Sequence, residues 1–390
     1  MAKRGRISLA LAIVVIISSS VYAADEQWLQ YRTSKEPWRV NISVAYQNPV
    51  VLTEAPEGVK LPEKIGPDMR LVKWETPMAK EGFLWLAFAR SQKDGSIDQL
   101  YIDSNADGSL ADETPITGLN ERGDSCDFGL VKVVFPTGDG PVTYHARVIY
   151  TERGDSKRPY IAAGCWYEGK VKVGGKDYEC ALVDYNGNGA FNDTSMDLEK
   201  CDTIRIGGRE APQKHFGKYL DIDGKLYHPQ PAPDGASIKF EEAVNVPMGT
   251  IVVGDKISSL IIAGENGQID FEVKEGKVQA PAGRWIVDNW GMKRQDTKGG
   301  QWSLGGRGFP ESGIFEVAEG KETALDIGEP ATSRLDVRKN NREYNFSESL
   351  TGKSGERVSL SMAGSQPPAP KLRIKNADGS YDRTFQFQYG

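Results

Sequence analysis

Two stretches of the chain carry nearly the same series of oxygen-bearing side chains. They span residues 103–112 and 184–193, and both follow the pattern D-x-N-x-[DN]-G-x-[LF]-x-D. Each stretch comes directly after an apolar run, 100–102 in the first case and 181–183 in the second. Carboxylate, carboxamide and backbone carbonyl oxygens are the ligands that calcium prefers, and it takes about six to eight of them. The spacing therefore predicts two calcium-binding loops.

The geometry of a tightly turning loop explains this spacing. Side chains at positions 1, 3 and 5 can point toward one centre, glycine at position 6 permits the chain reversal, and position 7 offers its backbone carbonyl. An apolar residue at position 8, Leu110 or Phe191, would fix the loop to a core. With the aspartate at position 10 included, the candidate ligands are Asp103, Asn105, Asp107, Ser109 and Asp112 in the first loop, and Asp184, Asn186, Asn188, Ala190 and Asp193 in the second.

Over these residues the two loops resemble the calcium loops of EF-hand and dockerin proteins. They differ at position 12, where those families have a carboxylate and this chain has Thr114 and Ser195. The flanking runs also predict strands where an EF-hand has helices. We therefore expect calcium loops attached to β-structure, with dissociation constants of roughly 10⁻⁴ to 10⁻³ M. Three carboxylates in the first loop against two in the second predict tighter binding by the first.

The alternative interpretation is that both stretches are ordinary turns. Asp-Gly and Asn-Gly pairs are common in hairpins, and Asp or Asn side chains stabilise turns by hydrogen bonds to the backbone. The recurrence of the whole pattern favours calcium in the first loop. The second loop, which is poorer in charge, stays open between the two interpretations. The further run 221–224 lacks the remaining ligands and predicts a turn only.

The N-terminal residues predict export. Three basic residues precede the apolar run 7–17, and small residues lead to a cleavage site after Ala23. We interpret residues 1–23 as a cleavable signal peptide, so the mature chain is expected to be secreted or to lie in the periplasm or cell envelope. No later segment of the sequence has the roughly 20 apolar residues that a membrane helix needs.

The charge balance narrows the class of partner. The chain has 48 Lys and Arg against 54 Asp and Glu, and three of the basic residues fall in the signal peptide. The mature chain therefore has 45 basic and 54 acidic residues, a formal net charge of −9. A negative net charge argues against nucleic acid as a partner, because its phosphates need a basic surface. It is compatible with cation binding, although mild acidity also serves solubility.

The remaining pattern predicts an all-β, multi-domain protein. Short runs rich in Val, Ile, Tyr and Trp alternate with turns, in a chain with 43 Gly and 21 Pro. We expect a β-rich domain with both loops over 24–240, a β-sandwich domain over 241–328 and a small immunoglobulin-like β domain over 329–390. The sequence of residues 280–285, A-P-A-G-R-W, resembles the entry to a strand in prealbumin-like β-sandwiches.

Individual strands can also be placed. Residues 82–89 are almost wholly apolar and predict a buried strand, and residues 142–150 alternate in the manner of a half-buried one. Residues 164–183 predict a hairpin that folds at Gly174-Gly175.

Four cysteines in an exported chain predict two disulfides, with three pairings open; the alternative is buried free thiols. The predicted hairpin argues against one pairing. If it folds at Gly174-Gly175, Cys180 lies opposite Gly169, so Cys165 and Cys180 are offset along the two strands. The four residues are Cys126, Cys165, Cys180 and Cys201.

No motif of nucleophilic, zinc or phosphate chemistry occurs in the sequence, and only three histidines are present. We therefore predict a non-enzymatic calcium-binding protein with a structural or adhesive role. One alternative is a carbohydrate-binding module that uses Trp285, Trp290 and Trp302, although tryptophans in sandwiches are more often core residues. Another alternative is a hydrolase whose active site is built from carboxylates, since many acidic pairs are available.

Overall fold

The chain forms an all-β structure in which several antiparallel sheets follow one another along the sequence. The structure is a computed structural model that describes residues 25–52, 54–65, 68–92, 95–120 and 124–389. The predicted signal peptide lies outside the described residues. About half of the chain is strand and only 3% is helix, so the predicted all-β class is confirmed. Among the helices that the structure describes, none is long and apolar enough to cross a membrane.

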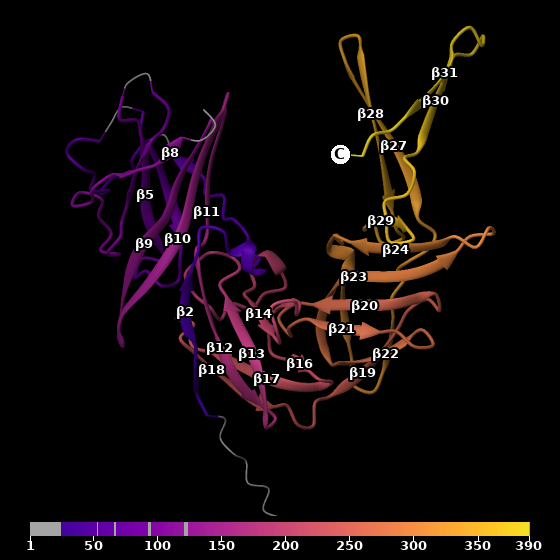
Figure 1. The fold of residues 1–390 in the computed structure, drawn as a ribbon, viewed down its shortest axis with the longest axis horizontal. Helices are drawn as coiled ribbons and strands as arrows, with labels where there is room; N and C mark the ends of the chain where they lie inside the picture. The colour runs from indigo at the N-terminus through magenta and orange to yellow at the C-terminus, as the bar shows by residue number, and fades with distance from the viewer. Residues whose placement is uncertain (1–24, 53, 66–67, 93–94, 121–123, 390) are drawn as a thin grey trace, which may run out of the picture.

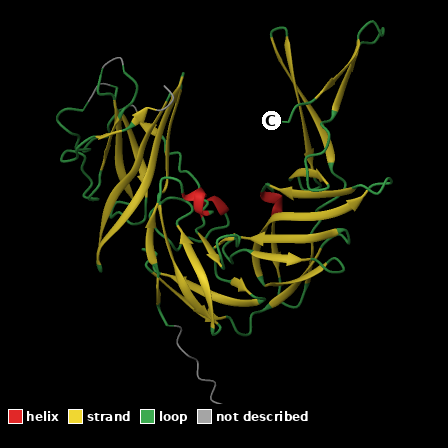
Figure 2. Ribbon diagram, in the orientation of Figure 1, coloured by secondary structure: helices red, strands yellow, loops and turns green. Residues whose placement is uncertain are grey.

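Figure 1 shows these sheets arranged along a U-shaped path. The strands of residues 51–163 form one side, the strands of residues 27–33 and 165–242 form the base, and the later strands form the other side. Two hairpins near the C-terminus extend beyond that second side. In the described part of the chain the helical segments are short 3-10 turns, drawn red in Figure 2: η1 (Pro37–Val40), η2 (Leu198–Lys200) and η3 (Glu311–Gly313).

Two sheets make up the first side of the molecule. One has the strand order β3-β4-β5-β6-β7 and the other has the order β11-β10-β9-β8. Their strands are β3 (Val51–Leu52), β4 (Arg70–Glu75), β5 (Phe83–Ala89), β6 (Gln99–Ile102), β7 (Ile116–Thr117), β8 (Leu119–Asn120), β9 (Ser125–Thr137), β10 (Gly140–Arg153) and β11 (Ser156–Ala163).

Two further sheets form the base of the molecule. Their strand orders are β15-β14-β13-β12-β2 and β1-β18-β17-β16. Their strands are β1 (Gln27–Trp28), β2 (Gln30–Thr33), β12 (Cys165–Val173), β13 (Lys176–Val183), β14 (Thr203–Ile206), β15 (Gln213–His215), β16 (Leu220–Ile222), β17 (Lys225–Pro231) and β18 (Ser237–Glu242).

The remaining strands lie in three sheets. A three-stranded sheet has the order β22-β19-β26, a larger sheet has the order β21-β20-β23-β24-β29-β28-β27 with β25 beside β23, and β30 pairs only with β31. These strands are β19 (Met248–Val252), β20 (Ile257–Ala263), β21 (Ile269–Glu272), β22 (Lys277–Pro281), β23 (Gly283–Gln295), β24 (Gln301–Arg307), β25 (Ile314–Val317), β26 (Glu322–Ala324), β27 (Thr332–Asn340), β28 (Glu343–Thr351), β29 (Arg357–Met362), β30 (Lys371–Lys375) and β31 (Asp382–Gln386).

The strand predictions that rest on local pattern are confirmed. The apolar run 82–89 forms β5, in which every residue after Phe83 is buried. In β10 every second side chain from Tyr144 to Tyr150 is buried, since Tyr144, Ala146, Val148 and Tyr150 are all at most 1% exposed. The hairpin of β12 and β13 turns at Gly174-Gly175 with the expected register.

Apolar side chains gather in two main cores. The larger core consists of buried residues between Leu29 and Phe240, and the other of buried residues between Ile251 and Val358. The second core crosses residue 328, and β29 pairs with β24 over six residue pairs. The strands of 332–362 therefore extend a sheet that begins before residue 328, whereas we expected a separate small domain there. The domain boundary at 240 and the resemblance to prealbumin-like sandwiches stay predictions.

The expectation of disulfides is wrong for this structure. All four cysteines are described, and all four are buried free thiols. The hairpin register is as predicted, with Cys180 opposite Gly169, and Cys165 lies opposite Thr33 of β2. Burial raises the pKa of the Cys165 and Cys180 thiols to about 12, so both are protonated and unreactive in the folded chain.

The tryptophan surface proposed for sugar stacking does not form. Trp285 and Trp290 are fully buried, and each donates its indole N–H inside the protein, to the Pro281 carbonyl and to the Glu356 carboxylate respectively. Trp302 is half-buried and donates to Asp296. Trp285 and Trp290 belong to the second core, because large aromatic rings contribute most when they are removed from water.

Candidate functional site

Both candidate loops begin where a central strand of a sheet ends. β6 lies between β5 and β7 and leads into Asp103, and β13 lies between β12 and β14 and leads into Asp184. The Asp103 N–H still donates to the Trp85 carbonyl, 3.0 Å away, so the first residue of that loop is held by the neighbouring strand. Each strand therefore places the carboxylate at position 1 at the inner end of its loop.

In the first loop the carboxylate of Asp103 organises the turn. It is 1% exposed and accepts the backbone N–H groups of Asp107 and Gly108 at 3.0 and 2.9 Å. Gly108 has a φ of +85°, which favours glycine at that position. The Asn105 carboxamide lies 3.2 Å from the Asp107 carboxylate and 3.3 Å from that of Asp112. Positions 1, 3, 5 and 10 thus lie together around one small region.

The rest of the first loop closes this arrangement. The Ser109 N–H donates to Asp107, and the Ser109 hydroxyl accepts the N–H of Ala111. Leu110, the apolar position 8, is fully buried as expected. Glu113 turns away toward Ser104, whose N–H and hydroxyl both donate to its carboxylate, at 2.6 and 2.9 Å. Asn105, Asp107 and Asp112 remain largely exposed.

In the second loop the carboxylate at position 1 lies deeper. Asp184 is 0% exposed and accepts the N–H groups of Gly187 and Gly189 at 2.6 and 2.7 Å. The hydroxyl of Tyr144, a core residue of β10, also donates to it at 2.7 Å. The Trp74 indole donates to the Gly187 carbonyl, so β4 holds the same turn. The second loop is therefore part of the larger core.

Amide and carboxylate groups converge in the outer half of the second loop. Asn186 and Asn188 both direct their side-chain amides at one oxygen of Asp193, at 2.9 and 2.6 Å. The Asn188 side-chain oxygen accepts the N–H of Ala190, and Asn186 also donates to the Lys200 carbonyl. All the candidate residues of positions 1, 3, 5, 7 and 10 thus lie in one continuous network.

The structure adds one carboxylate that the motif did not include. Asp202 is fully buried, and its two oxygens accept the N–H groups of Tyr185 and Asp193 at 3.1 and 2.8 Å. It lies outside the ten-residue pattern, directly before β14. Nothing in the sequence singles out Asp202, because an aspartate directly before a strand is common. Asp202 ties the beginning of the second loop to its end.

Burial gives these carboxylates unusual electrostatics. Removal from water raises the pKa of Asp103 to about 6 and, in the second loop, that of Asp184 to about 6. Asp202 has a pKa well above its ordinary value, first through burial and then through the charges of Asp184 and Asp193. None of the ion pairs recorded among the described residues involves any loop aspartate of the motif or Asp202. Buried negative charge without a basic partner is costly, and a bound cation would offset it.

The donor set fits calcium better than a transition metal. Within the described residues, no three His, Cys, Asp or Glu side chains form a group that could hold a metal ion. Either loop would therefore need carboxamide and backbone carbonyl oxygens beside its carboxylates. Oxygen ligands of this mixed kind suit a hard cation and do not suit zinc, which prefers Cys and His.

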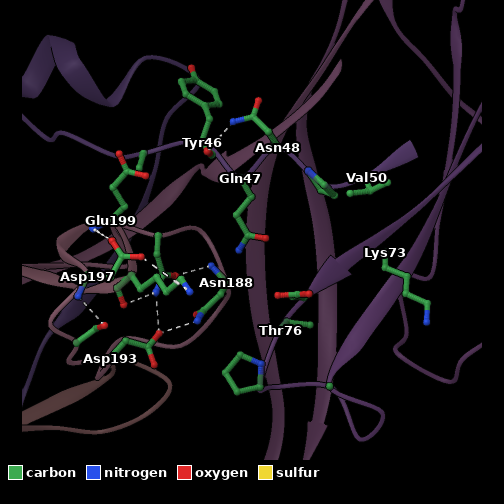
Figure 3. Close-up of a pocket in the computed structure, with 18 of the residues that line it drawn as sticks. Tyr46, Gln47, Asn48, Val50, Lys73, Thr76, Asn188, Asp193, Asp197 and Glu199 are labelled. Carbon is green, nitrogen blue, oxygen red and sulfur yellow. Dashed lines mark hydrogen bonds and ion pairs between the residues drawn. The ribbon is translucent and has the colours of Figure 1, made fainter. Parts of the chain in front are cut away.

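The outer face of the second loop opens into a cleft. The cavity has a volume of about 970 Å³ and is lined by three segments, 45–52, 73–82 and 186–200. Figure 3 shows Tyr46 and Gln47 on one side of it, Thr76 on another, and Asn188 and Asp193 from the second loop. Sequence reasoning missed this cleft, because the segment of the second loop lies more than 100 positions from the two other segments of its wall.

Comparison of the chain with known protein families, curated proteins and solved structures gave no match.

Proposed function

We propose that the mature chain is an exported, non-enzymatic calcium-binding protein in which both loops bind calcium and thereby hold the surface of the larger core together. The observation that carries the proposal is the repeated geometry. Each loop fixes one buried carboxylate at the end of a central strand by backbone N–H groups. Each loop also brings its outer carboxamide and carboxylate side chains together, Asn105 with Asp107 and Asp112 in the first loop, and Asn186 and Asn188 with Asp193 in the second. No described basic side chain forms an ion pair with those carboxylates.

The residues that would hold the cation are those of the shared pattern. In the first loop they are Asp103, Asn105, Asp107 and Asp112 with the backbone carbonyl of Ser109. In the second they are Asp184, Asn186, Asn188 and Asp193 with the carbonyl of Ala190, while Asp202 would orient the loop from behind. Calcium would supply positive charge and fix the amide and carboxylate groups in one arrangement.

A structural role follows from the expected affinity and location. Outside the cytoplasm calcium is abundant, and sites with dissociation constants of roughly 10⁻⁴ to 10⁻³ M stay filled there. A site that stays filled stabilises the folded state by mass action and does not signal. The position of Asp184 between Tyr144 and the turn at Gly187 supports this role, since a cation there would link two sheets. An adhesive role at the cell envelope belongs to the same proposal.

Thermal unfolding tests the proposal. We expect calcium to raise the melting temperature of the mature chain by several degrees over the value in a chelator, as ligand binding to the folded state requires. The double variant Asp103→Asn, Asp107→Asn should melt below the wild type in calcium and close to it in chelator. Magnesium at the same concentration is the control, and it should stabilise the chain less. Equal melting of wild type and variant at every calcium concentration would contradict binding at the first loop.

A further inference from the structure

The cleft beside the second loop has the features of a ligand site in its own right. Its volume of about 970 Å³ lies at the upper end of the range of roughly 300 to 1,000 Å³ that is typical of small-molecule sites. Its walls are fixed by backbone hydrogen bonds to other parts of the fold. Ala45 donates to the Tyr185 carbonyl, and Gln47 exchanges two backbone hydrogen bonds with Ile161 of β11. The segment that carries Tyr46 is therefore held between the second loop and the buried residue Ile161 on β11, the edge strand of its sheet.

One aromatic ring at the rim is both exposed and fixed in orientation. Tyr46 is 39% exposed, yet its hydroxyl accepts a hydrogen bond from Arg147 at 3.0 Å. Its ring also packs edge-to-face on Tyr160, with 6.0 Å between the ring centroids. A tyrosine held by its neighbours loses little conformational freedom when a ligand packs against its open face. Tyr46 therefore offers a preorganised apolar surface at the edge of a polar cleft.

The remaining lining is rich in groups that both donate and accept hydrogen bonds. Carboxamides come from Gln47, Asn48 and Asn188, and hydroxyls come from Thr76 and Ser195. Figure 3 shows the Gln47 side chain extending from the rim into the space between Asn188 and Thr76. Such groups match ligand hydroxyls, which also donate and accept at the same atom.

The charge of the lining restricts the ligand further. Four carboxylates line the cleft, from Glu75, Asp193, Asp197 and Glu199, against the two amines of Lys73 and Lys200. Both amines are already engaged. The Lys73 amine lies 4.3 Å from the centre of the Phe83 ring, and Lys200 lies 3.9 Å from Asp197. An anionic ligand would meet net repulsion here.

We propose that this cleft binds a neutral oligosaccharide, with the open face of Tyr46 against a sugar ring and with Gln47, Asn48 and the polar groups of the second loop hydrogen-bonded to hydroxyls. An oligosaccharide combines the two surfaces that the cleft offers, because its rings have apolar C–H faces and its edges carry hydroxyls. The proposal rests on the lining of the cleft and does not require that the second loop hold calcium.

Glycan-array binding of the full mature chain, followed by calorimetric titration of the strongest neutral oligosaccharide, tests this inference. The variants Tyr46→Ala and Gln47→Ala should each weaken binding about tenfold or more, since each removes one direct contact. Tyr344→Ala is the matched control, because Tyr344 is also an exposed tyrosine but lies on β28, outside the cleft. It should bind as the wild type does. Melting temperatures of all variants establish that they are folded.

Each outcome decides the inference. Loss of oligosaccharide binding in Tyr46→Ala and Gln47→Ala, but not in Tyr344→Ala, supports it. No binding to any neutral oligosaccharide by the folded chain, in calcium and in chelator alike, overturns it, as does binding that Tyr46→Ala and Gln47→Ala leave unchanged. Binding to acidic oligosaccharides or basic peptides alone also overturns it. Failure of calcium to raise the melting temperature while neutral sugars still bind would refute the calcium proposal and leave the cleft proposal standing.

Discussion

The two loops share one sequence pattern but differ in how deeply the fold encloses them. Asp103 is itself buried at the end of the central strand β6, but the outer residues Asn105, Asp107 and Asp112 remain exposed. Asp184 accepts a hydrogen bond from a buried tyrosine and is fully enclosed, with Asp202 behind it. The same local pattern can therefore form a surface turn or a part of the core, depending on the sheets packed around it.

This difference alters the expected order of affinity. Counting carboxylates within the pattern favours the first loop, three against two. Asp202 narrows that difference, and the second loop is held more rigidly by Tyr144, Trp74 and Asp202. Calcium affinity depends on both ligand charge and site rigidity. We therefore expect the second loop to bind calcium at least as tightly as the first.

The largest expected effect on stability comes from removing the buried charge at position 1, in a separate single variant for each loop. In calcium, Asp184→Asn should lower the free energy of unfolding by about 3 kcal/mol, because its new amide would face the Gly189 N–H inside the core. Asp103→Asn should cost about 1 to 2 kcal/mol, since solvent can reach more of its loop. Urea denaturation measures both values. Equal losses in the two variants would remove the distinction between a core loop and a surface loop.

The pH dependence of stability should reverse when calcium is removed. In chelator, the pKa values of Asp103 and Asp184, raised to about 6 by burial, favour the protonated folded state. A raised folded-state pKa contributes stability below the unfolded value of about 4, and that stability is lost as the pH rises through about 6. Calcium needs the ionised carboxylates, so its stabilising effect should grow between about pH 5 and pH 7. Melting curves at several pH values, with and without calcium, measure this. A calcium effect that is independent of pH would contradict it.

A smaller effect should follow from making the second loop more like the first. Asn188→Asp places a carboxylate at position 5, where the first loop has Asp107. It should strengthen calcium binding several-fold, because affinity rises with ligand charge, and it should lower stability in chelator by repulsion from Asp193. The reciprocal variant Asp107→Asn should weaken calcium binding by the first loop. Unchanged affinity in both variants would mean that position 5 is not a ligand.

Local pattern in the sequence predicted much of the fold but not how distant segments meet. The buried strand β5, the alternating strand β10 and the turn at Gly174-Gly175 depend on neighbouring residues, so periodicity and turn chemistry suffice for them. The pairing of β24 with β29 is a contact between segments 50 to 60 positions apart, and no signal in either strand specifies it.

In the candidate site, too, the features set by local sequence were predicted and those set by distant contacts were not. The pattern identified the candidate ligands of both loops, and the structure brings each set into one network. Asp202 and the cleft were missed because three-dimensional packing alone places them beside the second loop. The thiol state of the cysteines was missed for a related reason. The predicted hairpin register already argued against pairing Cys165 with Cys180, but sequence spacing gives no distances for the pairings that involve Cys126 and Cys201.

Calcium binding at equilibrium tests the central claim most directly. The mature chain, first stripped with chelator, would be dialysed against increasing calcium and its bound metal measured. The account predicts saturation at two calcium ions per chain with dissociation constants of roughly 10⁻⁴ to 10⁻³ M. It also predicts the loss of one ion in Asp184→Asn and of the other in Asp103→Asn. A folded wild-type chain that binds no calcium over this range would contradict the account.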